Sequence, residues 1–149
     1  MLQAVQEKFR QLSEIDMTAL FFRVMDNPGI QQQLIDFNKA QLNDHGVFAD
    51  GTPTGDYAPS TIKYKISKGQ PYDHVTLNDT GYAQGTMNVK DVSGGVVINA
   101  DTMKPGGDLG KRYPEMLGLT PDSLNAIKPL FNELFAIEYK KAINTIMNG

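Results

Sequence analysis

The sequence predicts an α+β fold, in which a helical N-terminal half and a long C-terminal helix pack on a small antiparallel β-sheet. Between Val75 and Ala100, two runs rich in β-branched residues are separated by Ser93, Gly94 and Gly95. On both sides of this segment, apolar residues recur at the three- and four-residue spacing of amphipathic helices. Because an isolated hairpin is only marginally stable in water, we expect the helices to cover the sheet.

The central segment is predicted to form one β-hairpin, with strands at about 82–91 and 96–100. In the first run, apolar and polar residues alternate, which is typical of a half-buried strand. The glycines between the runs can adopt the positive φ that a tight turn requires. Ahead of the hairpin, Gly81 is also expected to have a positive φ or a backbone contact too close for a Cβ, and Leu77 is expected to be buried.

Helices are predicted over about residues 2–44, beginning with an apolar stripe at Leu2, Val5, Phe9 and Leu12. Ser13 is predicted to cap the second helix, with Asp16 in the position of a capping box. Asn27 and Pro28 are the predicted cap and first residue of a third helix, which runs to about Gln41 or Asp44.

The remaining elements follow from glycine, proline and capping residues. Residues 45–58 are predicted to be a loop, 60–68 a short helix and 101–111 a second, mobile loop. Thr120, Pro121 and Asp122 are typical of a helix start and predict a C-terminal helix over 121–147. With 149 residues, the chain is expected to form a single domain.

Composition excludes several classes of protein. There is no cysteine, so neither a disulfide scaffold nor a thiolate metal site is possible. The net charge of −3 shows no overall basic footprint for nucleic acid, and we expect no specific nucleic-acid partner. The most apolar stretch, Ala19 to Met25, contains Arg23 and is far too short to span a membrane, so no membrane partner is expected.

No constellation of residues predicts catalysis, and we expect no enzyme activity, cofactor or metal. His45 and His74 are the only histidines, and neither has the spacing of a metal ligand. The segment from Gly106 to Arg112 differs from a phosphate-binding loop in both its spacing and its last residue. Scattered carboxylates could still converge in space. A small hydrolase and a nucleic-acid-binding accessory protein therefore remain alternatives, and the second requires the basic patches to merge on one face.

Candidate interface residues come from three patterns. Two local basic groups are present, although a solvated surface is their default interpretation. Two methionines lie outside the helical stripes, and a further set lies on the polar face of the first predicted strand. The candidates are Lys63, Lys65 and Lys68; Lys104, Lys111 and Arg112; Met103 and Met116; and Tyr82, Gln84 and Lys90.

Three separated blocks resemble small virion-morphogenesis proteins of tailed bacteriophages, the tail-completion, tail-terminator and neck proteins. The central block, Leu77-Asn78-Asp79-Thr80-Gly81, is similar to the L-x-x-T-G element of that family. The upstream block consists of Asp50-Gly51 and then Tyr57-x-Pro59-x-Thr61-Ile62-x-x-Lys65, where many members have Trp in place of Tyr57. The downstream block runs from Arg112 to Thr120 and resembles the entry into the family's last helix. Together the blocks lie within about residues 30–148.

This resemblance implies a structural role in the virion, with assembly in the host cytoplasm. It implies a homo-oligomeric ring, hexamer or dodecamer, which stacks on neighbouring connector, portal or tail-tube proteins. Little protects the edge of the predicted hairpin, since only Lys90 and Asp91 are charged and no proline lies between Tyr82 and Val97. We therefore expect residues 82–100 and the loop 101–111 to lie at a subunit or partner interface. The junction of the virion, the ring size and the partners stay open.

Overall fold

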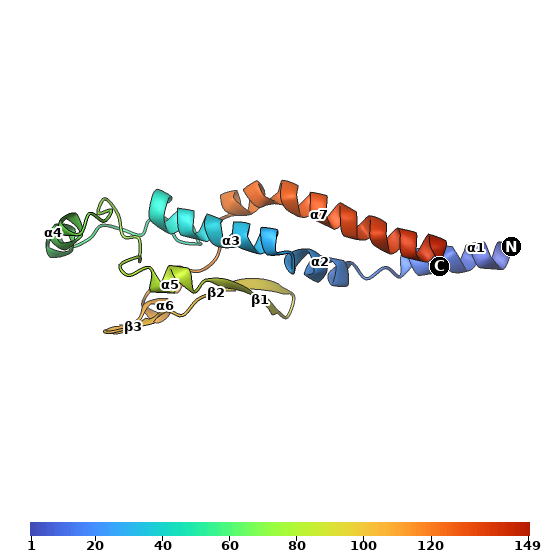
Figure 1. Cartoon of the computed structure of the whole chain (residues 1–149), viewed down its shortest axis with the longest axis horizontal. Coiled ribbons are helices and arrows are strands. Elements are labelled where there is room, and N and C mark those ends of the chain that lie inside the picture. The colour runs from blue at the N-terminus through green and yellow to red at the C-terminus, as the bar shows by residue number, and fades with distance from the viewer. The chain divides into compact units, whose positions relative to one another are not determined.

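The computed structural model describes residues 1–149 and confirms the α+β class, with seven α-helices and two small antiparallel sheets (Figure 1). The chain divides into two compact units. One combines Met1–Gln31 with Ile127–Gly149, and the other comprises Gln32–Ala126. None of the helices combines the length and the apolar character that crossing a lipid bilayer requires.

The first unit contains α1 (Leu2–Ser13), α2 (Met17–Met25), the start of α3 (Pro28–Ala40) and most of α7 (Pro121–Asn148). Phe131 of α7 packs between two other aromatic rings, with centroid distances of 5.7 Å to Phe21 and 5.8 Å to Phe135. The buried apolar residues of this unit are Leu20, Val24, Met25, Ile30 and Ile127. In contrast, α1 has no buried residue.

The predicted cap of α2 was wrong by three residues. Asp16 is the N-cap, and its carboxylate accepts a hydrogen bond from the backbone N–H of Ala19 at 3.1 Å. Ser13 instead ends α1 and donates its hydroxyl to the carbonyl of Arg10 at 2.6 Å. An N-cap needs an extended backbone, which Asp16 has and the helical Ser13 lacks.

The predicted start of α3 is confirmed. The side-chain oxygen of Asn27 accepts hydrogen bonds from the backbone of Gly29 at 2.8 Å and of Ile30 at 3.3 Å. After Ala40 the helix widens into a π-helical turn, Gln41–His45, which Gly46 ends in the left-handed conformation. This turn accounts for the two endpoints, Gln41 and Asp44, that the sequence left open.

In the second unit, two buried amides of α3 and its π-helical turn hold the segment that precedes α7. Asn38 donates to the carbonyl of Met116 at 2.9 Å and accepts from the N–H of Gly118 at 2.8 Å. Gln41 donates to the carbonyl of Gly118 at 3.0 Å and accepts from the N–H of Thr120 at 2.9 Å. The downstream block of the resemblance is therefore tied to α3 and its π-helical turn through four hydrogen bonds.

Both predicted flanking helices form. Helix α4 spans Pro59–Ser67. At the start of α7, the hydroxyl of Thr120 accepts from the N–H of Ser123 at 3.2 Å, and the helix continues through Pro129 to Asn148. The loop at 45–58 is also present, although one isolated bridge joins Val47 and Pro53 across it.

The hairpin is confirmed, but its first strand begins later than predicted. Strands β1 (Asn88–Val92) and β2 (Gly95–Asn99) pair in antiparallel register, whereas Tyr82–Gly85 form the short helix α5. Gly81 has φ +80°, as predicted, and the hydroxyl of Thr80 accepts from the N–H of Tyr82 at 3.3 Å. This turn directs residues 82–85 into a helix, which the apolar alternation did not indicate.

Residues 101–111 were predicted to be a second, mobile loop, but the structure has regular elements in most of this segment. They contain a second hairpin, β3 (Met103–Lys104) and β4 (Gly107–Asp108), followed by the helical turn α6 (Leu109–Arg112). The carboxylate of Asp108 accepts from the hydroxyl of Thr102 at 2.5 Å and from the N–H of Gly110 at 2.8 Å, where it caps α6. Pro105 and Gly106 form the turn between the two strands.

Candidate assembly interface

The β1–β2 hairpin forms a sheet of only two strands, so one edge of each strand is unpaired. The loop consists of Ser93 and Gly94, and Gly94 has φ +83°. In such a β-turn, Val92 and Gly95 form a hydrogen-bonded pair. Hydrogen-bonded and non-hydrogen-bonded pairs then alternate along the ladder, which turns the backbone polar groups of Val96 and Ile98 toward the free edge of β2.

The two faces of this hairpin differ in exposure. Val89, Val96 and Ile98 are half-buried and share one face, as the predicted alternation requires. On the opposite face, Lys90 is exposed and Val97 keeps 44% of its surface accessible. Charged residues occur on β1 but not on β2. The free edge of β2 therefore lacks the usual devices that prevent a further strand from pairing.

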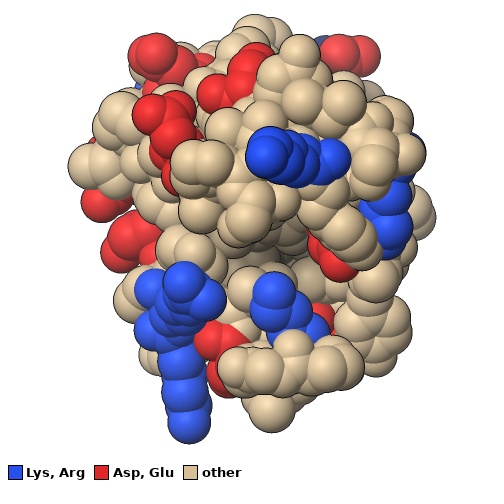
Figure 2. Space-filling model, turned by 90° about the vertical axis from the view of Figure 1, so that its left-hand side faces the viewer, with Lys and Arg blue, Asp and Glu red and all other residues tan.

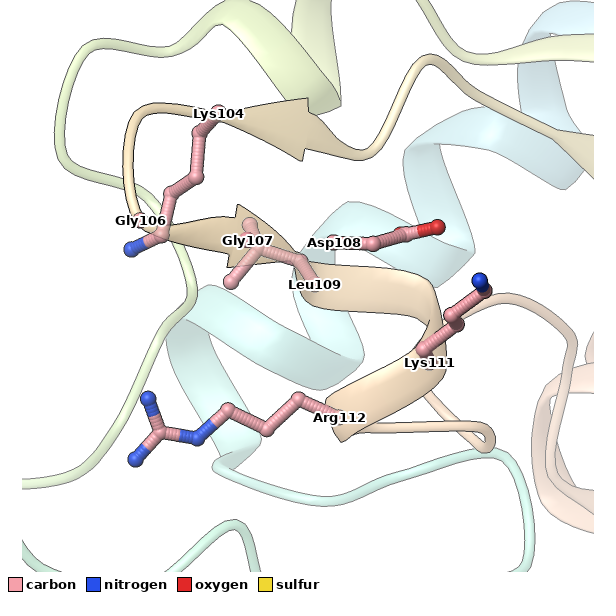
Figure 3. A pocket seen from close by; sticks show the side chains of 7 residues that line it. All are labelled: Lys104, Gly106, Gly107, Asp108, Leu109, Lys111 and Arg112. Atoms are coloured by element: carbon pink, nitrogen blue, oxygen red, sulfur yellow. The ribbon is translucent and has the colours of Figure 1, made fainter.

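A basic hollow lies beside the second hairpin and has a volume of about 340 Å³ (Figure 3). Its walls come from β3, β4, α6 and the turn between the two strands. In Figure 3 the side chains of Lys104 and Arg112 extend toward the same side as the Gly106 turn, whereas Lys111 extends toward Asp108. The lining residues are Lys104, Gly106, Gly107, Asp108, Leu109, Lys111 and Arg112.

The acidic groups near the hollow are engaged in the fold. The hydrogen bond from Thr102 lowers the pKa of Asp108, against an opposing cost of desolvation, and the N–H of Gly110 and the charge of Lys111 lower it further. Asp101 accepts from the hydroxyl of Tyr82 at 2.8 Å, which raises the pKa of that phenol.

The basic groups are not engaged in the same way. Lys104, Lys111 and Arg112 form no ion pair, and Arg112 lies 5.4 Å from the ring centroid of Tyr113. The charges of Lys104 and Arg112 are therefore available to an anionic group from outside, whereas the charge of Lys111 acts on Asp108.

Three of the candidate interface residues are buried, so the sequence placed them wrongly on the surface. Lys65 is only 4% exposed, and its ammonium lies 4.7 Å from the ring centroid of Tyr57 in a cation–π contact. Gln84 pairs its side-chain amide with that of Asn43. Met116 belongs to a buried apolar cluster with Ala83 and Leu109.

The other candidates are exposed: Lys63, Lys68, Tyr82, Lys90, Met103, Lys104, Lys111 and Arg112. Of these, Lys68 is paired with Asp79 at 3.8 Å. Sequence reasoning missed Val92 and Val97, which are also exposed on the hairpin. In the ladder Val92 pairs with Gly95 and Val97 pairs with Lys90, so both valines share a face with Lys90. Residues on the same face as an exposed lysine are expected to face solvent, and this pattern could have identified the two valines as exposed.

On the face drawn in Figure 2, the basic residues do not form one continuous surface. On the face drawn in Figure 2, lysine and arginine side chains occur as separate groups with acidic and uncharged side chains between them. With Lys65 buried and Lys68 paired, the first predicted patch is reduced to Lys63. The merged basic face that the nucleic-acid alternative requires is not seen in this view.

The surroundings of His74 give it a structural role. The Nε2 atom of His74 lies 3.0 Å from the carbonyl of Leu42, and its Nδ1 atom lies 3.2 Å from Asp73. Its ring also occupies the space beside Gly46, where an added Cβ would lie only 2.8 Å away. The structure contains no group of three or more His, Asp and Glu side chains arranged to hold a metal ion.

Comparison of the chain with models of protein families, with curated proteins and with solved structures found no match in any of the three. The resemblance to phage morphogenesis proteins stays a prediction from the sequence motifs.

Proposed function

We propose that the chain is a structural virion protein of a tailed phage, which forms a ring at the head–tail connector or at the tail end. The motif blocks support this proposal, because in this fold they are turns and caps that determine the backbone path. Gly81 has a positive φ, and Thr120 caps α7. The segment between Met116 and Thr120 is held by buried amides.

The observation that carries the proposal is the unprotected edge of β2 close in sequence to a hollow of unpaired basic groups. Such an edge accepts a strand from a neighbouring chain through backbone hydrogen bonds. The cationic groups Lys104 and Arg112 add a region that favours acidic surfaces. A head-to-tail contact of this kind closes into a cyclic ring when its rotation is a simple fraction of a turn.

On this proposal the function depends on interface geometry and involves no turnover. The subunit presents residues 88–99 and 103–112 to its neighbours, and the rigid core positions these segments. The partners are further copies in the ring and the connector, portal or tail-tube proteins above and below it.

A structure of the assembled particle tests the proposal. The surface of each residue in the particle is compared with its surface in the isolated chain. We expect the β2 edge and the basic hollow to become buried between subunits. A particle that lacks the chain would contradict the virion role. A particle in which residues 88–112 stay exposed, while another surface makes every contact, would contradict only the choice of interface.

A further inference from the structure

Helix α1 presents an apolar stripe to solvent. Leu2 is 70% exposed, Val5 45% and Phe9 68%. All three lie on the side of the helix that also carries Leu12, and no residue of α1 is buried. Isolated exposed apolar residues are ordinary, but a contiguous row of large ones marks a surface that binds something.

Contacts beside and opposite the stripe hold α1 against the end of α7. The ammonium group of Lys8 donates to the carbonyls of Ile146 at 3.1 Å and Met147 at 2.6 Å. A positive charge at this position satisfies the free carbonyls in the last turn of α7 and complements the helix dipole. Ala4 and Gln11 lie beside the same end of α7. A polar capping contact, and not the apolar stripe, therefore holds α1.

The spacing of the stripe favours pairing with an identical helix. Leu2 and Phe9 are seven residues apart, and so are Val5 and Leu12, which makes them the a and d positions of two heptads. The flanking e positions are Gln6 and Ser13, and the flanking g position is Lys8, so a parallel pair would place each Lys8 beside an uncharged Ser13 of the other copy.

The charges of α1 are largely neutralised within the chain. The guanidinium of Arg10 contacts the carboxylates of both Glu7 and Glu14, on the polar side of the helix. Lys8, the charged residue next to the stripe, is bound to α7. An interfacial lipid-binding helix usually carries free lysine and arginine on its polar face, and α1 has none. These charges favour a like helix over an anionic membrane surface.

We propose that α1 pairs through this stripe with α1 of a second copy of the chain. The inference concerns the first unit and does not depend on the phage role or on the hairpin interface. Two heptads provide a short seam, so the pairing is weak in dilute solution and depends on protein concentration. In an oligomer held together elsewhere, the high local concentration strengthens it.

The absence of cysteine permits a direct test on the full chain, because one introduced thiol reports one position. Val5→Cys places a thiol on the stripe, and Gln3→Cys places a matched thiol on the same helix away from it. Under mild oxidation at high protein concentration, we expect covalent dimers from Val5→Cys and few from Gln3→Cys. Equal yields from the two variants, or no dimer from either, would overturn the proposal.

A second measurement separates this surface from the hairpin interface. Phe9→Glu in the Val5→Cys background is expected to reduce the cross-linking rate by about tenfold or more, because it buries a charge in the seam. Met103→Glu, at a similarly exposed apolar residue of β3, is expected to leave that rate unchanged. If Met103→Glu has the same effect as Phe9→Glu, the contact does not belong to α1.

Lipid binding is the competing explanation for the stripe. Flotation with vesicles of phosphatidylcholine and phosphatidylglycerol tests it with the same variants. We expect the chain to remain unbound. Flotation that Phe9→Glu abolishes, without cross-linking by Val5→Cys, would assign the stripe to a membrane surface and overturn the proposal.

Discussion

At the scale of single residues, the L-x-x-T-G element contains two residues with a left-handed backbone conformation. Leu77 has φ +56° and is the only non-glycine residue with a positive φ, and Gly81 has φ +80°. Left-handed conformations are costly for residues that have a Cβ. Leu77 accepts this conformation while its side chain packs on the cluster of Ala83, Leu109 and Met116. It is half-buried, so the prediction that it would be buried is confirmed only in part.

Gly81→Ala is therefore expected to destabilise the fold by about 1 kcal/mol through backbone strain. Space is not the reason, because the nearest atom to an added Cβ lies 3.6 Å away, on Asn78. Gly85→Ala is the matched control. Gly85 has no positive φ, and nothing lies within 4 Å of its added Cβ. Urea denaturation measures both variants, and equal loss of stability in the two would show that the conformation of Gly81 is not the cause.

Lys65 and Gln84 could not be placed from the sequence because residues outside their own helices set their environment. Lys65 is buried against Tyr57, and Gln84 is paired with Asn43, forty-one residues away. Three residues with a local role were predicted correctly. Asn27 caps α3, Thr120 caps α7 and Gly81 turns the chain, because capping and turn chemistry depend on immediate neighbours.

At the scale of elements, the start of α2 shows how close alternatives compete. Both Ser13 and Asp16 can cap a helix, and the structure selects Asp16. Asp16→Ala is expected to cost about 1 kcal/mol, since it leaves the N–H of Ala19 without its partner. Ser13→Ala is expected to change stability by less than about 0.5 kcal/mol. Thermal denaturation of the two variants decides between the caps, and a larger loss for Ser13→Ala would contradict the assignment.

The charged carboxylate of Asp108 holds the junction between β4 and α6, where Asp108 caps the helix. Hydrogen bonding to Thr102 lowers the pKa of Asp108 in the folded chain below its ordinary value. A lowered folded-state pKa stabilises the fold above the unfolded-state pKa, and this contribution is lost as the pH falls through the folded-state value. Stability is therefore expected to fall below about pH 4, the usual range of aspartate.

Asp108→Ala tests this pH dependence. The variant is expected to be less stable at neutral pH and to lose less stability on acidification than the unmodified chain. Denaturant midpoints measured between neutral pH and pH 3 show the difference. Parallel pH curves for the two proteins would mean that Asp108 does not contribute through its charge.

In the hairpin region, apolar alternation predicts the strands, whereas turn and capping residues decide where the strands begin and end. Alternation correctly placed Val89 on the half-buried face of β1. It failed at Tyr82–Gly85, where a left-handed glycine and a threonine hydroxyl start a helical turn. In the segment 101–111, glycine and proline suggested mobility. The buried Leu109 and the hydrogen bonds of Asp108 instead hold a hairpin there. Side-chain hydrogen bonds of this kind produce no periodic pattern in the sequence, so the second hairpin could not be predicted from periodicity.

At the scale of the whole molecule, two surfaces lie open to other chains: the β2 edge with the basic hollow, and the apolar stripe of α1. They belong to different units. A ring subunit needs contacts with neighbours on more than one surface, and separate surfaces allow lateral and stacking contacts to be made independently. Because each surface can be altered without touching the other, their contributions to assembly can be measured separately.

The β2 edge permits a substitution that blocks pairing with little change in the hairpin itself. The N–H of Val96 points toward the free edge and makes no hydrogen bond to β1. Val96→Pro removes this donor and places a ring where a partner strand would lie. We expect the chain to keep its fold by circular dichroism but to lose incorporation into particles when it is supplied in trans to cells that produce them.

Asp91→Pro makes the matching change on the outer edge of β1, because Asp91 lies opposite Val96 in the ladder. We expect this variant to be incorporated normally, since the charged edge of β1 is the less suited to pairing. Loss of incorporation for Asp91→Pro alone would move the interface to the other strand. If a folded Val96→Pro protein enters the particle as efficiently as the unmodified chain, subunits do not join by adding a strand to β2, and the basic hollow or α1 must make the contact instead.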